Sequence, residues 1–277
     1  MIDFSSPLTR DFFENGFSDD CPIIDMHAHM FNYAGGRMIA DTPKKVLSYM
    51  ERANVRLAVF SSHRTLMDGF CADYDLNIWK SYPKNFRLYY PVLSKKANAE
   101  RDIRIVDENP AYIGFKFLCD YYRVPLEDKR HEPYLEYANT KKMPILCHTW
   151  GHSEFDGVNN ARKVLRKYSD LTFLAGHSFR GDEDEACKIG KDFENLYFEL
   201  TAVLSETGRL EKLLDAGLME RIVFGVDAPW FSYHSYIGAL LSAGIDDDTI
   251  KDILFRNALT VLNKSTAEKE YLHEILI

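Results

Sequence analysis

One pattern repeats along nearly the whole chain: a short apolar run followed by an amphipathic stretch. The runs are rich in β-branched and aromatic residues, which suits parallel strands buried on both faces. The stretches between them have helical spacing, as in the apolar stripe of Val46, Leu47 and Met50. The eight runs lie at 22–29, 56–62, 86–94, 111–119, 144–150, 171–178, 196–203 and 221–230.

Eight strand–helix units over about 250 residues are what a (β/α)₈ TIM barrel requires, so we predict this single-domain α/β fold. An open doubly wound sheet is the structural alternative, but no glycine-rich phosphate loop follows the first run. We expect residues 1–20 to form a lead-in that packs on the barrel, 21–263 to form the barrel itself, and 264–277 to form a C-terminal helix.

Charge and cysteine content restrict the partners and the compartment. The formal net charge of −8 disfavours nucleic acid, which needs clustered Lys and Arg. No apolar run is long enough to span a membrane, and the N-terminus lacks the features of a signal peptide. Five scattered cysteines without a CxxC pair indicate reduced thiols and a cytoplasmic protein. We therefore expect a small-molecule substrate, with a homo-oligomer as an open alternative because aromatic residues are numerous.

Polar side chains fall near the C-terminal ends of four predicted strands. His27 and His29 lie on the first, His148 on the fifth, His177 on the sixth and Asp227 on the eighth. Residues at i and i+2 of a strand share a face, so both imidazoles of the first strand can reach one cation. Because a barrel collects these strand ends at one rim, the sequence predicts a metal site there.

Each of these residues also has an ordinary structural interpretation. A single strand-end His is usually a hydrogen-bonded core residue, and Asp227 before Ala228-Pro229 could simply begin a turn. The combination on four strands favours the metal interpretation. Neutral imidazole and carboxylate suit Zn²⁺, with Mn²⁺ or Fe²⁺ as alternatives. Asp25 shares the parity of His27 one step deeper, where its carboxylate would orient a ligand imidazole.

The motifs DMHAH, GFKF, ILCHTW, LAGHS, RIVFGVDAPW and FRNALTVL occur in this order over roughly residues 21–262. Together they resemble the amidohydrolase superfamily, and most of all its amidohydrolase-related branch of TIM-barrel metal-dependent hydrolases. The resemblance implies that His27, His29 and His148 are metal ligands. It implies that Asp227 is a ligand and the proton acceptor for the attacking water. His177 would bind a second metal or act on the substrate.

The resemblance leaves Lys116 in GFKF open, because a fourth-strand Lys is carbamylated and bridges two metals in some superfamily members. We favour an unmodified Lys116 that contacts substrate or a structural partner. Loop residues after the strands are candidates for substrate binding, since Arg pairs with carboxylates and aromatic side chains suit planar groups. They are Arg64, Tyr121, Trp150, Arg180 and Trp230.

The expected function is hydrolysis of an amide, lactone or other ester by a metal-activated water. A decarboxylase of an unsaturated or aromatic acid is the main alternative. A TatD-like deoxyribonuclease is disfavoured, because Lys116 stands where that family would have a fourth-strand Glu and the net charge is −8. A barrel that only binds a ligand is the non-catalytic alternative, although every expected ligand type is present.

Overall fold

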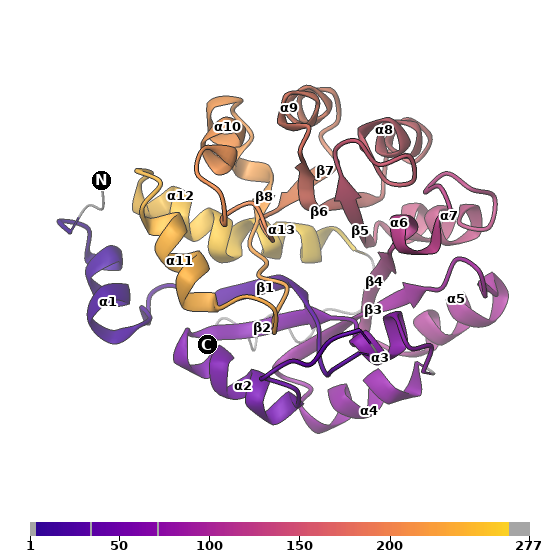
Figure 1. The fold of residues 1–277 in the computed structure, drawn as a ribbon, viewed down its shortest axis with the longest axis horizontal. Coiled ribbons are helices and arrows are strands. Elements are labelled where there is room, and N and C mark those ends of the chain that lie inside the picture. The colour runs from indigo at the N-terminus through magenta and orange to yellow at the C-terminus, as the bar shows by residue number, and fades with distance from the viewer. Residues whose placement is uncertain (1–3, 34, 71, 266–277) are drawn as a thin grey trace.

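The computed structural model describes residues 4–33, 35–70 and 72–265. Eight parallel strands follow one another in chain order in a single sheet, with helices around the outside (Figure 1). The predicted TIM barrel is therefore confirmed. The strands are β1 (Ile23–Ala28), β2 (Val55–Phe60), β3 (Phe86–Val92), β4 (Tyr112–Phe117), β5 (Pro144–Trp150), β6 (Thr172–Arg180), β7 (Leu196–Glu199) and β8 (Ile222–Val223).

Hydrogen bonds between the first and last strand regions close the sheet. The Met26 N–H donates to the Phe224 carbonyl over 2.9 Å, and a parallel bridge joins Ala28 to Ala228. Closure leaves no exposed sheet edge among the described strands, and it brings the residues that follow β8 beside the end of β1.

Helices alternate with the strands as the spacing predicts. In α2 the Thr42 hydroxyl caps the Lys45 N–H at the N-terminus, Pro43 fills the first turn, and the predicted stripe of Val46, Leu47 and Met50 is buried. The helices are α1 (Pro7–Asn15), α2 (Pro43–Arg52), α3 (His63–Leu66), α4 (Asp73–Ser81), α5 (Ala99–Glu108), α6 (Cys119–Tyr122), α7 (Glu132–Lys141), α8 (Val158–Lys167), α9 (Glu183–Asp192), α10 (Arg209–Asp215), η1 (Met219–Arg221), α11 (Tyr233–Leu241), α12 (Asp247–Lys251), a π-helical turn η2 (Asp252–Arg256) and α13 (Asn257–Lys264).

The barrel interior is filled from one end. Apolar side chains from all eight strands form one inner cluster, and Ala258, Val261 and Leu262 of α13 join it. Helix α13 therefore closes the end of the barrel opposite the C-terminal strand ends. The strand members of this cluster are Ile24, Met26, Leu57, Val59, Tyr89, Ile113, Leu146, Leu174, Tyr197 and Val223. The polar side chains of the strand ends converge at the other end of the barrel, above this apolar cluster.

The eighth strand is shorter than the apolar run predicted for it. It is regular only over Ile222–Val223, and the backbone then turns at Asp227, whose φ of 55° lies in the left-handed region. The helical segment that follows consists of α11, α12, η2 and α13. The predicted C-terminal helix at 264–277 lies almost entirely outside the described residues. No helix among those described is long and apolar enough to cross a membrane.

Candidate active site

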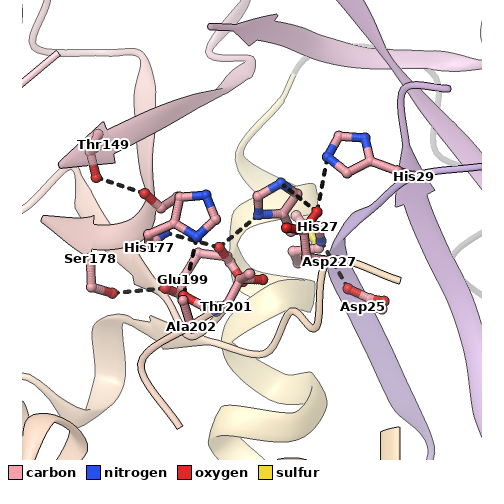
Figure 2. Close-up of polar contacts among 12 residues, drawn as sticks. Asp25, His27, His29, Thr149, His177, Ser178, Glu199, Thr201, Ala202 and Asp227 are labelled. Atoms are coloured by element: carbon pink, nitrogen blue, oxygen red, sulfur yellow. Dashed lines mark hydrogen bonds and ion pairs between the residues drawn. The ribbon is translucent and has the colours of Figure 1, made fainter. Parts of the chain in front are cut away.

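The ends of β1 and β8 bring three predicted residues together. His27, His29 and Asp227 each present one ligand atom, and these atoms all lie within 4.8 Å of one another. Asp227 Oδ1 is 3.0 Å from His29 Nε2 and 3.7 Å from His27 Nε2 (Figure 2). The Asp227 N–H donates to the His27 carbonyl over 2.8 Å, which ties the two strand ends together. The cluster is therefore held by the backbone as well as by its side chains.

The hydrogen bonds of both rings set their tautomers. His29 Nδ1 lies 2.7 Å from the Ser61 carbonyl, which can only accept, so Nδ1 carries the proton. His27 Nδ1 lies 2.8 Å from Glu199 Oε2, which assigns the proton in the same way. The Nε2 atoms of both rings lie on the side of the Asp227 carboxylate, and His27 Nε2 also lies 2.8 Å from Lys116 Nζ. Two imidazole nitrogens and a carboxylate oxygen gathered in this way are a donor set that a divalent cation takes.

The state of the Asp227 carboxylate also indicates a bound cation at this position. Within the described residues its Oδ1 is buried and has no hydrogen bond of acceptable geometry. Burial alone would raise the pKa of Asp227, but the neighbouring His27 and His29 hold it well below its ordinary value, so the carboxylate is ionised. The residues present fit a divalent metal. A mixed imidazole and carboxylate set does not by itself select Zn²⁺ over Mn²⁺ or Fe²⁺.

Glu199 at the end of β7 is a site residue that the sequence interpretation missed. Besides the contact with His27, its Oε2 accepts the His177 N–H at 3.2 Å, and its Oε1 accepts from the Thr201 N–H at 2.6 Å and hydroxyl at 2.5 Å. The side chain is fully buried, which raises the pKa of Glu199. An acidic residue inside the apolar run LYFEL was the available signal. Such a residue must find partners where the strand ends.

The prediction for Asp25 was wrong in its geometry. Its Oδ1 accepts the backbone N–H of His27 at 2.9 Å, and its Oδ2 accepts the Tyr233 hydroxyl at 2.9 Å. The reason is a register shift in β1 between Asp25 and Ala28, which places Met26 and His27 both toward the interior. Asp25 therefore turns toward α11 and orients the strand, while Glu199 orients the ring.

His177 lies between β5 and the three candidate ligands His27, His29 and Asp227, which we call the metal-ligand cluster. Its ring centroid is 5.4 Å from that of His27, and its ring stacks on Trp150 at 4.8 Å. Burial, with the nearby His148 and His27, lowers the pKa of His177 well below its ordinary value, so the ring is neutral. His177, Ser178 and Phe179 all have positive φ, a strained run of the kind found at functional sites.

His148 belongs to a second cluster. Its ring contacts His177 edge to face at 4.4 Å, while its Nδ1 lies 3.1 Å from both carboxylate oxygens of Asp120. Burial would raise the pKa of Asp120, but the hydrogen bond from His148 keeps it below its ordinary value. Burial and the Asp120 charge raise the pKa of the neighbouring Asp156 to about 7. Neither carboxylate is among the site residues predicted from the sequence.

Lys116 faces the barrel interior. Its Nζ lies 2.8 Å from His27 Nε2, and the residue is 1 % exposed. Burial lowers the pKa of Lys116 to about 8, although Asp227 and Glu199 oppose this shift. Its amine therefore adjoins the metal-ligand cluster, which is compatible with substrate contact.

Aromatic side chains surround the rim on the β1, β2 and β8 side. The Trp230 indole N–H donates to His63 Nε2 over 3.0 Å, and His63 stacks on His29 at 4.8 Å. Tyr33 lies beside both His63 and Trp230, with ring centroids 5.3 and 5.8 Å away. Trp230 remains 44 % exposed. This wall borders the metal-ligand cluster directly.

The remaining predicted substrate residues have varied surroundings. Tyr121 is exposed, and its ring lies 5.4 Å from that of His148. The Arg180 guanidinium lies over Trp150 and pairs with Glu206. Arg64 instead packs over Phe31 and hydrogen-bonds to the hydroxyl of Tyr74. Both arginines thus already have protein partners.

Comparisons with known proteins identify the family of the chain. The family model described as Amidohydrolase matches residues 24–264. The chain belongs to the amidohydrolase family. The family resemblance inferred from the motifs, and the prediction of an enzyme, are thereby confirmed. A search of curated proteins found no match to this amidohydrolase.

Solved structures share its fold at low identity. An uncharacterised TIM-barrel protein from Bordetella bronchiseptica is 18 % identical, with a TM-score of 0.72 over 88 % of this chain and 99 % of the other. A dihydroxybenzoic acid decarboxylase from a Polaromonas species, with bound manganese and 2-nitroresorcinol, is 14 % identical, with a TM-score of 0.71 over 91 % and 99 %. A probable 2-pyrone-4,6-dicarboxylic acid hydrolase from Acinetobacter baumannii, with bound citric acid, is 15 % identical, with a TM-score of 0.68 over 88 % and 99 %.

Proposed function

We propose that this amidohydrolase is a metal-dependent hydrolase of an amide, lactone or other ester of a small, carboxylate-bearing molecule. The observation that carries the proposal is the convergence of one ligand atom each from His27, His29 and Asp227 within 4.8 Å, with Asp227 Oδ1 3.0 Å from His29 Nε2 and 3.7 Å from His27 Nε2. These three residues would hold the metal, with His148 and His177 as further ligand candidates. The bound ion, which we expect to be Zn²⁺, supplies Lewis acidity and lowers the pKa of a water from 15.7 towards about 7.

Asp227 is the proton carrier in this proposal. Its carboxylate is ionised, because its histidine neighbours hold its pKa low, and its side chain is 16 % exposed at the open end of the barrel. It can therefore accept the proton of the attacking water and return it to the leaving group. The backbone bond from Asp227 N–H to His27 keeps the carboxylate beside the two rings.

In this proposal, Lys116 and His177 are the residues that act on the reacting carbonyl. The Lys116 amine is a buried donor beside His27, so it can stabilise negative charge on the carbonyl oxygen. Neutral His177 has its Nδ1 3.3 Å from the Thr201 carbonyl, which leaves Nε2 as a lone pair for proton transfer or coordination. Trp150 stacked on His177 limits the movement of that ring.

Decarboxylation of an unsaturated or aromatic acid is the second candidate. The aromatic wall of Tyr33, His63 and Trp230 directly beside the metal-ligand cluster suits a planar ring. The decarboxylase and the hydrolase with similar folds act on ring-containing acids according to their names. The same residues would serve both reactions, so product analysis has to separate them.

The first test is metal content of protein purified without chelators, for wild type, His27→Ala and Asp227→Ala. We expect tightly held divalent metal in wild type and its loss in both variants. Metal-loaded wild type is then screened with lactones, amides and unsaturated acids, with the hydrolysis products and carbon dioxide release measured in parallel. A new carboxylate with its alcohol or amine and without carbon dioxide supports hydrolysis, and carbon dioxide release supports the second candidate. Wild type that holds no metal after supplementation overturns the proposal in favour of a binding barrel.

A further inference from the structure

We propose that Asp120 and Asp156 are positioning residues for His148, forming a two-carboxyl chain that turns the Nε2 edge of its ring toward the active site. The proposal deepens the function proposed above and rests on it for the identity of the site that His148 serves. It concerns three segments that meet beside β5: helix α6, the end of β5, and the loop before α8.

The contact between Asp120 and His148 is the first link. His148 Nδ1 lies 3.1 Å from both Oδ1 and Oδ2 of Asp120, and the His148 side chain is 10 % exposed. A carboxylate can only accept, so this contact selects the ring with the proton on Nδ1. Nε2 is then the nitrogen that can bind a metal or accept a proton.

The second link holds the backbone of Asp120, which carries that carboxylate. Asp156 Oδ2 accepts the Asp120 N–H at 2.9 Å, and the three ligand atoms of Asp120, His148 and Asp156 lie within 4.8 Å of one another. The Asp156 N–H approaches the Ser153 hydroxyl at 3.3 Å, which anchors the loop. Asp156 is fully buried although it carries a carboxyl group.

The Asp156 carboxyl group has an unpartnered oxygen, which a simple ion pair between Asp120 and His148 would not explain. Among the residues that the structure describes, Asp156 Oδ1 is buried and has no hydrogen-bond partner. The Asp120 side chain is 21 % exposed, whereas Asp156 is fully buried and is joined to Asp120 through the N–H that its Oδ2 accepts.

The primary test reads the tautomer of His148 directly in metal-free protein. Nitrogen-15 spectra of histidine-labelled protein at pH 8 distinguish a protonated from an unprotonated ring nitrogen, and a His148→Gln variant assigns the signals. We expect wild type to show Nδ1–H and a bare Nε2. Asp120→Ala is expected to give a mixture of both tautomers, because the acceptor is gone. A matched control is Asp182→Ala, since Asp182 approaches the exposed His152 only to 3.7 Å.

Variants of Asp156 test the second link. In Asp156→Asn the amide oxygen can still accept the Asp120 N–H, so we expect the wild-type tautomer. Asp156→Ala removes this contact and is expected to approach Asp120→Ala. A wild-type tautomer in Asp156→Ala would overturn the role of Asp156, and an Asp156→Asn spectrum like that of Asp156→Ala would overturn the role of its contact with the Asp120 N–H.

Cobalt(II) titration, followed by visible absorption, adds the link to the active site. Asp120→Ala is expected to weaken cobalt binding about 10- to 100-fold, while Asp182→Ala leaves it unchanged. Unaltered tautomer and unaltered cobalt affinity in Asp120→Ala would overturn the inference. His27→Ala provides the separate check on the proposed function: if it keeps wild-type cobalt affinity, the metal site is wrong, whereas the tautomer result still stands on its own.

Discussion

His27 Nδ1 and Glu199 Oε2 lie 2.8 Å apart across the barrel interior, joining the end of β1 to the end of β7. The same carboxylate accepts the His177 N–H, so one side chain orients the ring of His27 and the backbone of His177. Two candidate ligands from different strands thus depend on a single buried acid. This dependence makes Glu199 the sharpest point at which to test the geometry of the site.

Replacing Glu199 with Gln should weaken metal binding without abolishing the fold. The amide group must turn its nitrogen toward either His27 or Thr201, both of which donate, so one set of hydrogen bonds is lost. We expect cobalt affinity to fall about 10- to 100-fold and the free energy of unfolding to fall by about 1–3 kcal/mol. Cobalt titration and urea unfolding measure the two, with exposed Glu108→Gln as control. Wild-type cobalt affinity in the Glu199 variant would contradict the orienting role.

Gly225 should tolerate no side chain, because the Glu199 carboxylate packs directly against it. A Cβ at this position would lie 2.2 Å from Glu199 Oε1 and 2.9 Å from the Cβ of His27. We expect Gly225→Ala to destabilise the fold by about 1–3 kcal/mol through overpacking and to weaken cobalt binding. Gly238→Ala is the matched control, since that helical position has open space and should gain about 0.5–1 kcal/mol. Equal stability changes in the two variants, measured by urea unfolding, would refute the packing argument.

Trp230 should influence substrate binding more than turnover. Its indole N–H donates to His63, which holds the half-exposed ring beside the metal-ligand cluster. Trp230→Phe loses this bond, worth about 0.5–1.5 kcal/mol, so we expect kcat/KM for a ring-containing substrate to fall about 2- to 10-fold, mainly through KM. Steady-state kinetics test this once a substrate is found. Trp79→Phe on α4 controls for the loss of an indole, and a fall confined to kcat would contradict the prediction.

Asp75 should make stability depend on pH. Burial raises the pKa of Asp75 above 3.8, although the Ser62 N–H and the Thr65 hydroxyl donate to its Oδ2. The folded protein therefore binds this proton more tightly than the unfolded chain, so its stabilising effect is full below the unfolded pKa and declines as pH rises through the folded pKa. Relative to Asp75→Asn, we expect the unfolding free energy of wild type to decrease as pH rises from about 4.

Urea unfolding at a series of pH values measures this difference. Asp215→Asn serves as the control, because Asp215 is exposed on the surface of α10. A difference between wild type and Asp75→Asn that stays constant with pH, or grows as pH rises, would show that the buried carboxyl does not hold its proton in the folded state.

The amino-acid sequence by itself determined the barrel and the ends of its strands. Apolar runs alternating with amphipathic stretches leave one economical way to bury both faces of eight strands. The positions of His27, His29 and Asp227 within their runs then place them at the C-terminal rim of the barrel, which is why these three can be named from the sequence alone. These inferences depend on the spacing of apolar and polar residues within single strands and helices, which can be read from short stretches of the sequence.

Only the tertiary structure decided which polar groups meet. The register shift in β1 turns Asp25 outward and lets the His27 ring hydrogen-bond to Glu199, an acid 172 residues away in the chain. Asp120 finds His148 through adjacent strand ends, and Arg180 pairs with Glu206 across two loops. A pattern of alternating residues cannot reveal a β-bulge. The pairing of buried charges depends on distances between segments that lie far apart in the sequence, and residue spacing along the chain does not give those distances. Electrostatic complementarity is therefore settled only when the barrel closes.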